Sequence, residues 1–404
     1  MSDATGLHSL FLIMLIAAAV PLIVRRMPGP NVPEVVLLLI SGILIGPHVL
    51  GWATFESSID LISNVGLGML FFLAGFELER AVVTGVQGKA AAVAWAMSMC
   101  ISMAVVGVLA EVGFVRAFLP VSIALTTTAL GTLVPILRDA GIIRSPMGRA
   151  VMANGAIGEL FPIIAISVFL STQGTWAALG LLAAFGIAAL ALARIVSSAR
   201  GRWLATAIRS GAETSSQTTV RFSVLLLVAL LAAASRLGLD VVLGAFAGGI
   251  VLRIALPDGD RALENKLDGL GYGFFIPAFF VISGMNLDVG SVIRDPARVL
   301  VFFGLMLAIR GLPVVALFWR WMPGIDAVRL GLYAATGLPL IVAITQIALQ
   351  AGVMRADNAA ALVGAGLLTV IFFPMLARVL PDRAAERPTS TGPLDDHDVV
   401  AATE

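Results

Sequence analysis

Long apolar stretches recur along the whole chain, each of a length that fits the thickness of a lipid bilayer. At 1.5 Å per helical residue, a run of about 18 to 25 apolar residues crosses a hydrocarbon core of about 30 Å. This pattern predicts an all-α membrane protein with about thirteen transmembrane helices. The expected spans are 6–24, 33–50, 59–78, 89–112, 117–137, 148–171, 176–194, 220–236, 240–256, 269–287, 297–319, 328–350 and 357–380.

The composition agrees with lipid as the main solvent. Hydrophobic residues make up 59% of the chain and charged residues only 13%, whereas soluble domains carry about 25% charged residues. The formal net charge of +1 provides no basic field, so nucleic acid is not a predicted partner. Most of the 26 Lys and Arg residues fall in alternate connections, so the positive-inside rule predicts an outside N-terminus and a cytoplasmic C-terminus.

The two halves of the chain show weak similarity in the same order, which predicts an inverted repeat. We expect a transmembrane domain over 1–380, with repeat one at about 6–171, a linker helix at about 176–194 and repeat two at about 220–380. A single linker helix between two six-helix repeats inverts the second copy across the membrane. Residues 381–404 are polar and read as a disordered cytoplasmic tail.

Two charged residues fall near the middle of predicted spans, where charge is costly and therefore usually functional. Glu159 lies roughly 18 Å into its helix, and Arg310 is similarly central in its own. A carboxylate at this depth can hold either a dehydrated cation or a proton. Glu159 could instead only fasten two helices, and Arg310 could be a structural partner of Glu159, Glu77 or a helix C-terminus. Glu77 is expected near the cytoplasmic end of its span.

Two spans contain residues that disfavour a continuous helix. Residues 126–135 combine β-branched hydroxyl residues with Gly and Pro, and 336–339 read Thr-Gly-Leu-Pro. Breaks at these places would expose helix ends whose partial charges can offset Glu159 and Arg310. A kinked packing helix is the alternative. The residues assigned to the breaks are Thr127, Gly131, Pro135, Gly337 and Pro339, and the candidate ligands around Glu159 are Thr128, Thr132, Asn154 and Gly158.

Other ligand types are scarce. Cys100 is the single cysteine, and His8, His48 and His397 are dispersed, so we expect no cofactor and no metal other than a transported monovalent cation. Asn154 and Gln346 are polar residues within spans that could add ligands or form interhelical hydrogen bonds. No catalytic set of paired Asp, His-Glu-x-x-His or Ser with His at one depth is present, so an enzyme is not expected.

Five stretches distributed over the membrane region carry a resemblance to a known family. They are residues 40–47, 72–78, 128–135, 243–248 and 277–285. Together they resemble the transmembrane part of the Kef-like branch of the monovalent cation:proton antiporter-2 family, which exchanges sodium or potassium for protons. The resemblance implies thirteen helices, a homodimer, two crossed broken helices, alternating access and a bacterial cytoplasmic membrane.

The chain departs from the family pattern at its expected ion site. Family members usually carry Asp preceded by Asp, Asn or Gln, where this chain has Gly158 and Glu159. The proton-binding role therefore passes to Glu159 by position. Arg310 stands where electrogenic relatives carry Lys, so we expect electroneutral exchange of one Na⁺ or K⁺ for one proton. The alternatives are a proton-coupled solute symporter, a cation uniporter, or a non-transporting membrane sensor.

Overall fold

The computed structural model describes residues 2–26, 33–77, 84–169, 217–237, 241–255, 261–322 and 324–380, with a few single positions between them. Within these ranges the ordered elements are all helices. Nine helical segments there are long and apolar enough to cross a membrane, and two shorter apolar helices accompany them. The expected all-α membrane class is confirmed. The predicted linker helix 176–194 lies mostly outside the described residues, and the predicted tail 381–404 lies entirely outside them.

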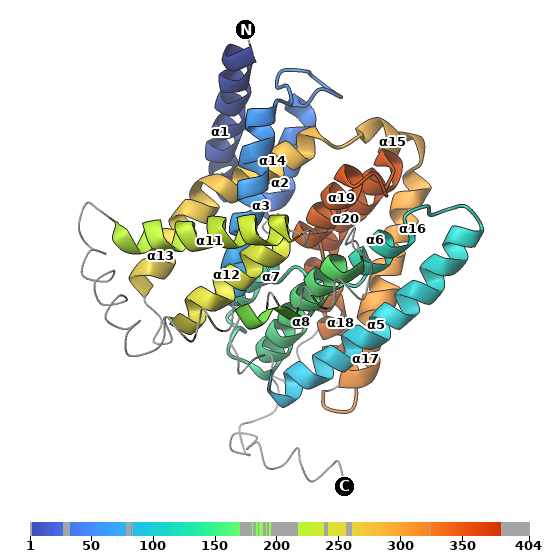
Figure 1. Cartoon of the computed structure of the whole chain (residues 1–404). Coiled ribbons are helices and arrows are strands. Elements are labelled where there is room, and N and C mark those ends of the chain that lie inside the picture. The colour runs from blue at the N-terminus through green and yellow to red at the C-terminus, as the bar shows by residue number, and fades with distance from the viewer. Residues whose placement is uncertain are drawn as a thin grey trace.

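One group of helices occupies one side of the molecule (Figure 1). Its members pack mainly on one another, with α3 on α12, α14 on α2 and α3, and α11 on α12. They are α1 (Ser2–Arg26), α2 (Glu34–Ile45), α3 (Ser57–Glu77), α11 (Thr218–Arg236), α12 (Val241–Ala255), α13 (Arg261–Leu270), the π-helix η1 (Gly271–Phe275) and α14 (Ile276–Met285). We call them the first helix group.

The second helix group packs beside the first (Figure 1). In it α5 lies on α8, α16 on α20 and α17 on α18. Its members are α5 (Val86–Glu111), α6 (Phe118–Ala124), α7 (Leu130–Asp139), α8 (Pro146–Phe169), α16 (Pro296–Met306), the π-helix η2 (Leu307–Gly311), α17 (Leu312–Phe318), α18 (Gly324–Ala334), α19 (Pro339–Gln350) and α20 (Ala356–Val379). The short helix α15 (Val289–Arg294) connects the groups and packs on α20.

Glycines set the closest helix contacts of the first helix group. A Cβ at Gly42 would lie 2.0 Å from a carbonyl oxygen of α14, and one at Gly284 would lie 2.2 Å from a carbonyl oxygen of α2. A Cβ at Gly75 on α3 would lie 2.2 Å from a carbonyl oxygen of α12, and one at Gly249 on α12 would lie 2.0 Å from a carbonyl oxygen of α3. Small residues allow this backbone approach, which drives helix association in lipid. Any larger residue at these four positions would separate the helix pairs.

Two helices of the second group are interrupted. The chain leaves helical geometry between α6 and α7 and again between α18 and α19. Pro339 is the first residue of α19, where its missing N–H removes no helical hydrogen bond. Pro135, in contrast, lies within α7 and not at the break to which we assigned it. The interruption comes earlier because Thr128 and Ala129 find hydrogen-bond acceptors outside their own helix.

The predicted span 33–50 is also shorter than expected. Helix α2 ends at Ile45, and Gly46 caps it in an extended conformation. Pro47 follows directly and cannot extend the helix. Residues 47–50 form a turn, so the prediction that the helix continues to residue 50 is wrong.

Candidate functional site

The two interrupted helices cross at their breaks, where hydrogen bonds join them to each other and to α8. The Thr128 N–H donates to the Gly158 carbonyl at 3.1 Å, and the Ala129 N–H donates to the Thr336 carbonyl at 2.7 Å. The Thr128 hydroxyl donates to the Ala334 carbonyl at 2.6 Å. Backbone groups that lost their helical partners are therefore satisfied by tertiary contacts. Two backbone hydrogen bonds and one side-chain hydrogen bond thus hold the crossing together.

Glu159 projects from α8 onto the start of α7. Its Oε1 accepts a hydrogen bond of 2.8 Å from the Leu130 N–H, the first amide of α7. The N-terminal end of a helix carries a partial positive charge and unpaired N–H groups, so it stabilises a carboxylate. The side chain is only half-buried. Glu159 is thus a carboxylate held in place by a half-helix and still accessible.

Arg310 is the largest fully buried side chain among the described residues. It lies on the π-helix η2, a distortion often found at functional sites. Its Nε donates to the Thr128 hydroxyl at 3.0 Å, and its Nη2 donates to the Asn154 carbonyl at 2.9 Å. The third nitrogen, Nη1, is buried without a hydrogen-bond partner. The guanidinium therefore supports the helix crossing.

The suggested ion pair between Arg310 and Glu159 or Glu77 is wrong for this conformation. Among the described residues, no carboxylate lies within 4.0 Å of the Arg310 nitrogens. Glu77 is the last residue of α3, is exposed and belongs to the other helix group. The acceptors of Arg310 are a hydroxyl and a carbonyl, so Glu159 and Arg310 are each compensated by different parts of the crossing.

Gly158 leaves room for this arrangement. A Cβ at position 158 would lie 2.4 Å from the Thr128 hydroxyl oxygen, 2.6 Å from the Thr128 Cβ and 3.0 Å from Nη2 of Arg310. The side chain of Thr128 thus fills the space that a residue at 158 would need. Asp, Asn or Gln could not stand before Glu159 here without displacing Thr128.

The other candidate residues lie around the crossing with different roles. Asn154 is fully buried, and its Nδ2 donates to the Ala150 carbonyl of its own helix at 2.9 Å instead of to another helix. Its Oδ1 is buried without a partner. Thr132 is buried on the first turn of α7, and Gly131 beside it is exposed.

The remaining break residues contact each other across the crossing. The Thr127 hydroxyl donates to the Ala124 carbonyl at 2.9 Å. A Cβ at Gly337 would lie 2.9 Å from that hydroxyl oxygen, so Gly337 allows the two breaks to approach. Its N–H donates to the Thr369 hydroxyl of α20 at 3.2 Å.

Sequence reasoning missed three contributors. Thr369 satisfies the second break, and the Leu130 N–H holds the carboxylate. Tyr272, on the π-helix η1 of the first helix group, places its hydroxyl 3.9 Å from where a Cβ at Gly131 would lie. In the sequence, Thr369 and Tyr272 are marked as possible site residues only by a hydroxyl group within a predicted span. The Leu130 amide is a backbone group, so no residue type in the sequence indicates it.

These features define a class of protein. An all-helical chain with several apolar spans, two crossed broken helices and charged groups at the crossing has the architecture of a secondary transporter. The model of the family described as sodium/hydrogen exchanger, transmembrane, matches residues 11–378. The chain belongs to this family, which confirms the family-level resemblance found in the sequence.

Individual relatives and one solved structure agree with the family. The chain is 26% identical over 402 residues to the putative Na⁺/H⁺ antiporter YjbQ of Bacillus subtilis, covering 94% of this chain and 64% of that protein. It is 26% identical over 375 residues to the Na⁺/H⁺-K⁺ antiporter GerN of Bacillus cereus, and the match covers 86% of this chain and 89% of GerN. The fold resembles that of the sodium proton antiporter MjNhaP1 of Methanocaldococcus jannaschii, with a TM-score of 0.62 and 17% sequence identity. The match covers 94% of this chain and 99% of the MjNhaP1 chain. The chain thus spans less than two thirds of the length of YjbQ.

Proposed function

We propose that this chain is a secondary antiporter that exchanges a monovalent cation, Na⁺ or K⁺, for a proton across a membrane. The observation that carries the proposal is the position of Glu159, a half-buried carboxylate fixed at the first amide of a half-helix. YjbQ and GerN, which are named as Na⁺/H⁺ and Na⁺/H⁺-K⁺ antiporters, support the same reaction. An enzymatic activity plays no part in this proposal.

Glu159 can exchange the two ions because it is the one carboxylate placed at the helix crossing in the described structure. A bound cation or a bound proton each neutralises it, whereas the half-buried empty carboxylate has lost part of its hydration, which is costly. The hydrogen bond from Leu130 keeps the carboxylate oriented during exchange. Thr128, Thr132, Asn154 and Gly158 are the proposed contributors of oxygen ligands or space for the ion.

Arg310 gives the site a constant positive charge. A guanidinium stays protonated in proteins, and this one is bound to Thr128 and to the Asn154 carbonyl. With one exchangeable group and one permanent charge, one monovalent cation replaces one proton and the cycle is electroneutral. A second exchangeable proton would require a second titrating group at the crossing.

The proposal includes an architecture of thirteen helices in two inverted repeats, assembled as a homodimer. The reciprocal glycine contacts support the repeat, because α2 meets α14 as α12 meets α3. In sequence, residues 33–42 resemble 239–248, which relates α2 to α12, and residues 71–79 resemble 279–288, which relates α3 to α14. The distribution of Lys and Arg supports an outside N-terminus and a cytoplasmic C-terminus in a bacterial cytoplasmic membrane.

Proton movement in reconstituted liposomes tests the function. The purified chain is placed in liposomes with a trapped pH dye, a pH gradient is imposed, and Na⁺, K⁺ or Li⁺ is added in turn. We expect the internal pH to change on adding Na⁺ or K⁺, in the direction of exchange. No response to any cation from folded protein would contradict an antiporter and favour a solute symporter or a sensor. Cation flux without proton movement would indicate a uniporter.

A further inference from the structure

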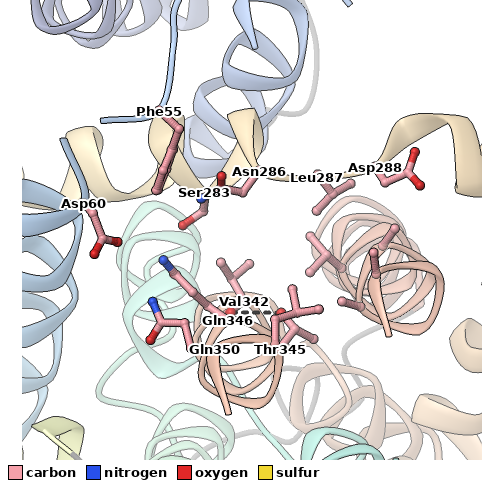
Figure 2. A pocket seen from close by; sticks show the side chains of 15 residues that line it. Phe55, Asp60, Ser283, Asn286, Leu287, Asp288, Val342, Thr345, Gln346 and Gln350 are labelled. Carbon is pink, nitrogen blue, oxygen red and sulfur yellow. Dashed lines mark hydrogen bonds between the residues drawn. The ribbon is translucent and has the colours of Figure 1, made fainter. Parts of the chain in front are cut away.

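A cavity of about 350 Å³ lies between the two helix groups, away from the helix crossing. It is lined by the start of α3, the end of α14 and the facing sides of α19 and α20 (Figure 2). Gln346 is seven residues beyond Pro339 on α19, so the cavity lies about 10 Å along this half-helix from the break. The cavity therefore adjoins the same half-helix that forms the crossing.

Several polar side chains lie together on one side of the cavity, whereas Asp288 and Thr345 line it elsewhere. Figure 2 shows Asp60, Ser283, Gln346 and Gln350 around this part of the cavity, whereas the opposite wall is built mainly from apolar side chains. Asp60 and Ser283 belong to the first helix group and Gln346 to the second. A ligand held by these three side chains would contact both groups at once.

Two of these side chains have unused oxygen acceptors. The hydroxyl of Ser283 and Oε1 of Gln346 are buried without a hydrogen-bond partner, and Ser283 is only 6% exposed. Buried polar atoms are normally paired, so each unpaired one calls for an explanation. The Asp60 carboxylate accepts one hydrogen bond, from Asn64 at 3.3 Å, and has no cationic partner among the described residues.

We propose that this cavity is a second cation site, which holds one monovalent cation between Asp60, Ser283 and Gln346. The carboxylate supplies one negative charge, which matches a monovalent ion, and the hydroxyl and amide oxygens supply neutral ligands. Oxygen ligands are those that hard cations prefer. The site goes beyond the proposed exchange at Glu159 and relies on that function only for the identity of the ion.

Asp288 offers an internal contrast because it lines the same cavity with a carboxylate that is already engaged. Figure 2 shows it pointing away from the polar cluster. The Ser291 hydroxyl and amide hydrogen-bond to it, and Arg294 lies 3.5 Å away. These contacts, the hydroxyl foremost, lower the pKa of Asp288. Its charge is thus compensated without a bound cation.

The second site is tested by measuring cation binding to the full chain after Glu159, the proposed exchange site, has been replaced. Purified Glu159→Gln protein is titrated with NaCl or KCl at constant ionic strength, with choline chloride as the balancing salt, and its thermal unfolding temperature is followed. A bound ion stabilises the folded state by mass action. We expect the unfolding temperature to rise with Na⁺ or K⁺ concentration and to reach a plateau.

Further substitutions in the Glu159→Gln protein should weaken this binding. Asp60→Asn should raise the half-saturating cation concentration about tenfold or more, and Ser283→Ala should raise it about three- to tenfold. Adding Asp288→Asn should change it less than about twofold.

The outcomes separate this site from the proposed exchange. A Glu159→Gln protein without a saturable response would overturn the second site, as would equal responses with and without Asp60→Asn and Ser283→Ala. The unfolding temperature in choline alone shows whether each variant is folded, and Asp60→Asn keeps the shape of the side chain. If wild type fails to exchange cations for protons in liposomes while these titrations behave as expected, the exchange function is wrong and the cation site stands.

Discussion

Oε1 of Glu159 accepts a 2.8 Å hydrogen bond from the Leu130 amide, 29 positions earlier in the chain. This bond brings the one carboxylate of the helix crossing to the positive end of a half-helix, where an anion is stabilised. The same interruption exposes Thr128, whose hydroxyl binds Arg310. A single break in the chain therefore positions both charged groups, each against a partner of suitable polarity.

Enlarging Gly158 should disrupt the crossing. In Gly158→Ala the new Cβ would meet the Thr128 side chain at 2.4 Å, and overpacking of this kind costs about 1–3 kcal/mol. We expect a lower unfolding temperature and reduced exchange. Gly304→Ala is the matched control, because a Cβ at that helical position has no atom within 4 Å. Equal unfolding temperatures for the two variants would contradict the close packing of Gly158 and Thr128.

Replacing Arg310 by Lys should impair the protein although the charge is kept. A Lys ammonium cannot reproduce the two separate contacts that the planar guanidinium makes with Thr128 and Asn154. Leaving a buried partner unsatisfied costs about 1–3 kcal/mol. We expect lower thermal stability and slower exchange in Arg310→Lys, measured beside Arg294→Lys, whose side chain is 73% exposed. Wild-type behaviour of Arg310→Lys would show that charge alone matters there.

The charged residues and the helix breaks could be predicted from the sequence, whereas the groups that they contact could not. Glu159, Arg310 and the runs at 126–135 and 336–339 stand out locally, because charge, Pro and Gly are unusual within apolar spans. The contacts that join them are tertiary. The Leu130 amide has no sequence signal, and the position of the first break depends on the Thr336 carbonyl, which is more than 200 residues away. The prediction extended that break to Gly131 and Pro135, which both lie within α7.

External pH should change the apparent affinity for the cation. If protons and cations compete for Glu159, lowering the pH raises proton occupancy, and more cation is needed to displace the proton. We expect the half-saturating cation concentration to rise as pH falls, with little change in maximal rate, in initial-rate measurements over a pH series. A maximal rate that falls at constant half-saturation would instead indicate that protonation acts outside the cation site.

Membrane voltage should leave the rate unchanged. Exchange of one monovalent cation for one proton moves no net charge, so a transmembrane potential does no work on the cycle. We expect equal initial rates in liposomes clamped at zero and at negative potential with a potassium gradient and valinomycin, with Na⁺ as the exchanged cation. Rates that depend on the potential would require an additional charge to move in each cycle.

The central claim is that one carboxylate exchanges the two ions, and it is tested most directly by Glu159→Gln in the liposome assay. The amide keeps the size of the side chain but binds neither a proton nor a cation as a carboxylate does. We predict that cation-dependent proton movement disappears in Glu159→Gln and persists in Glu111→Gln, which changes an exposed carboxylate at the end of α5. Exchange at the wild-type rate by folded Glu159→Gln would contradict the account.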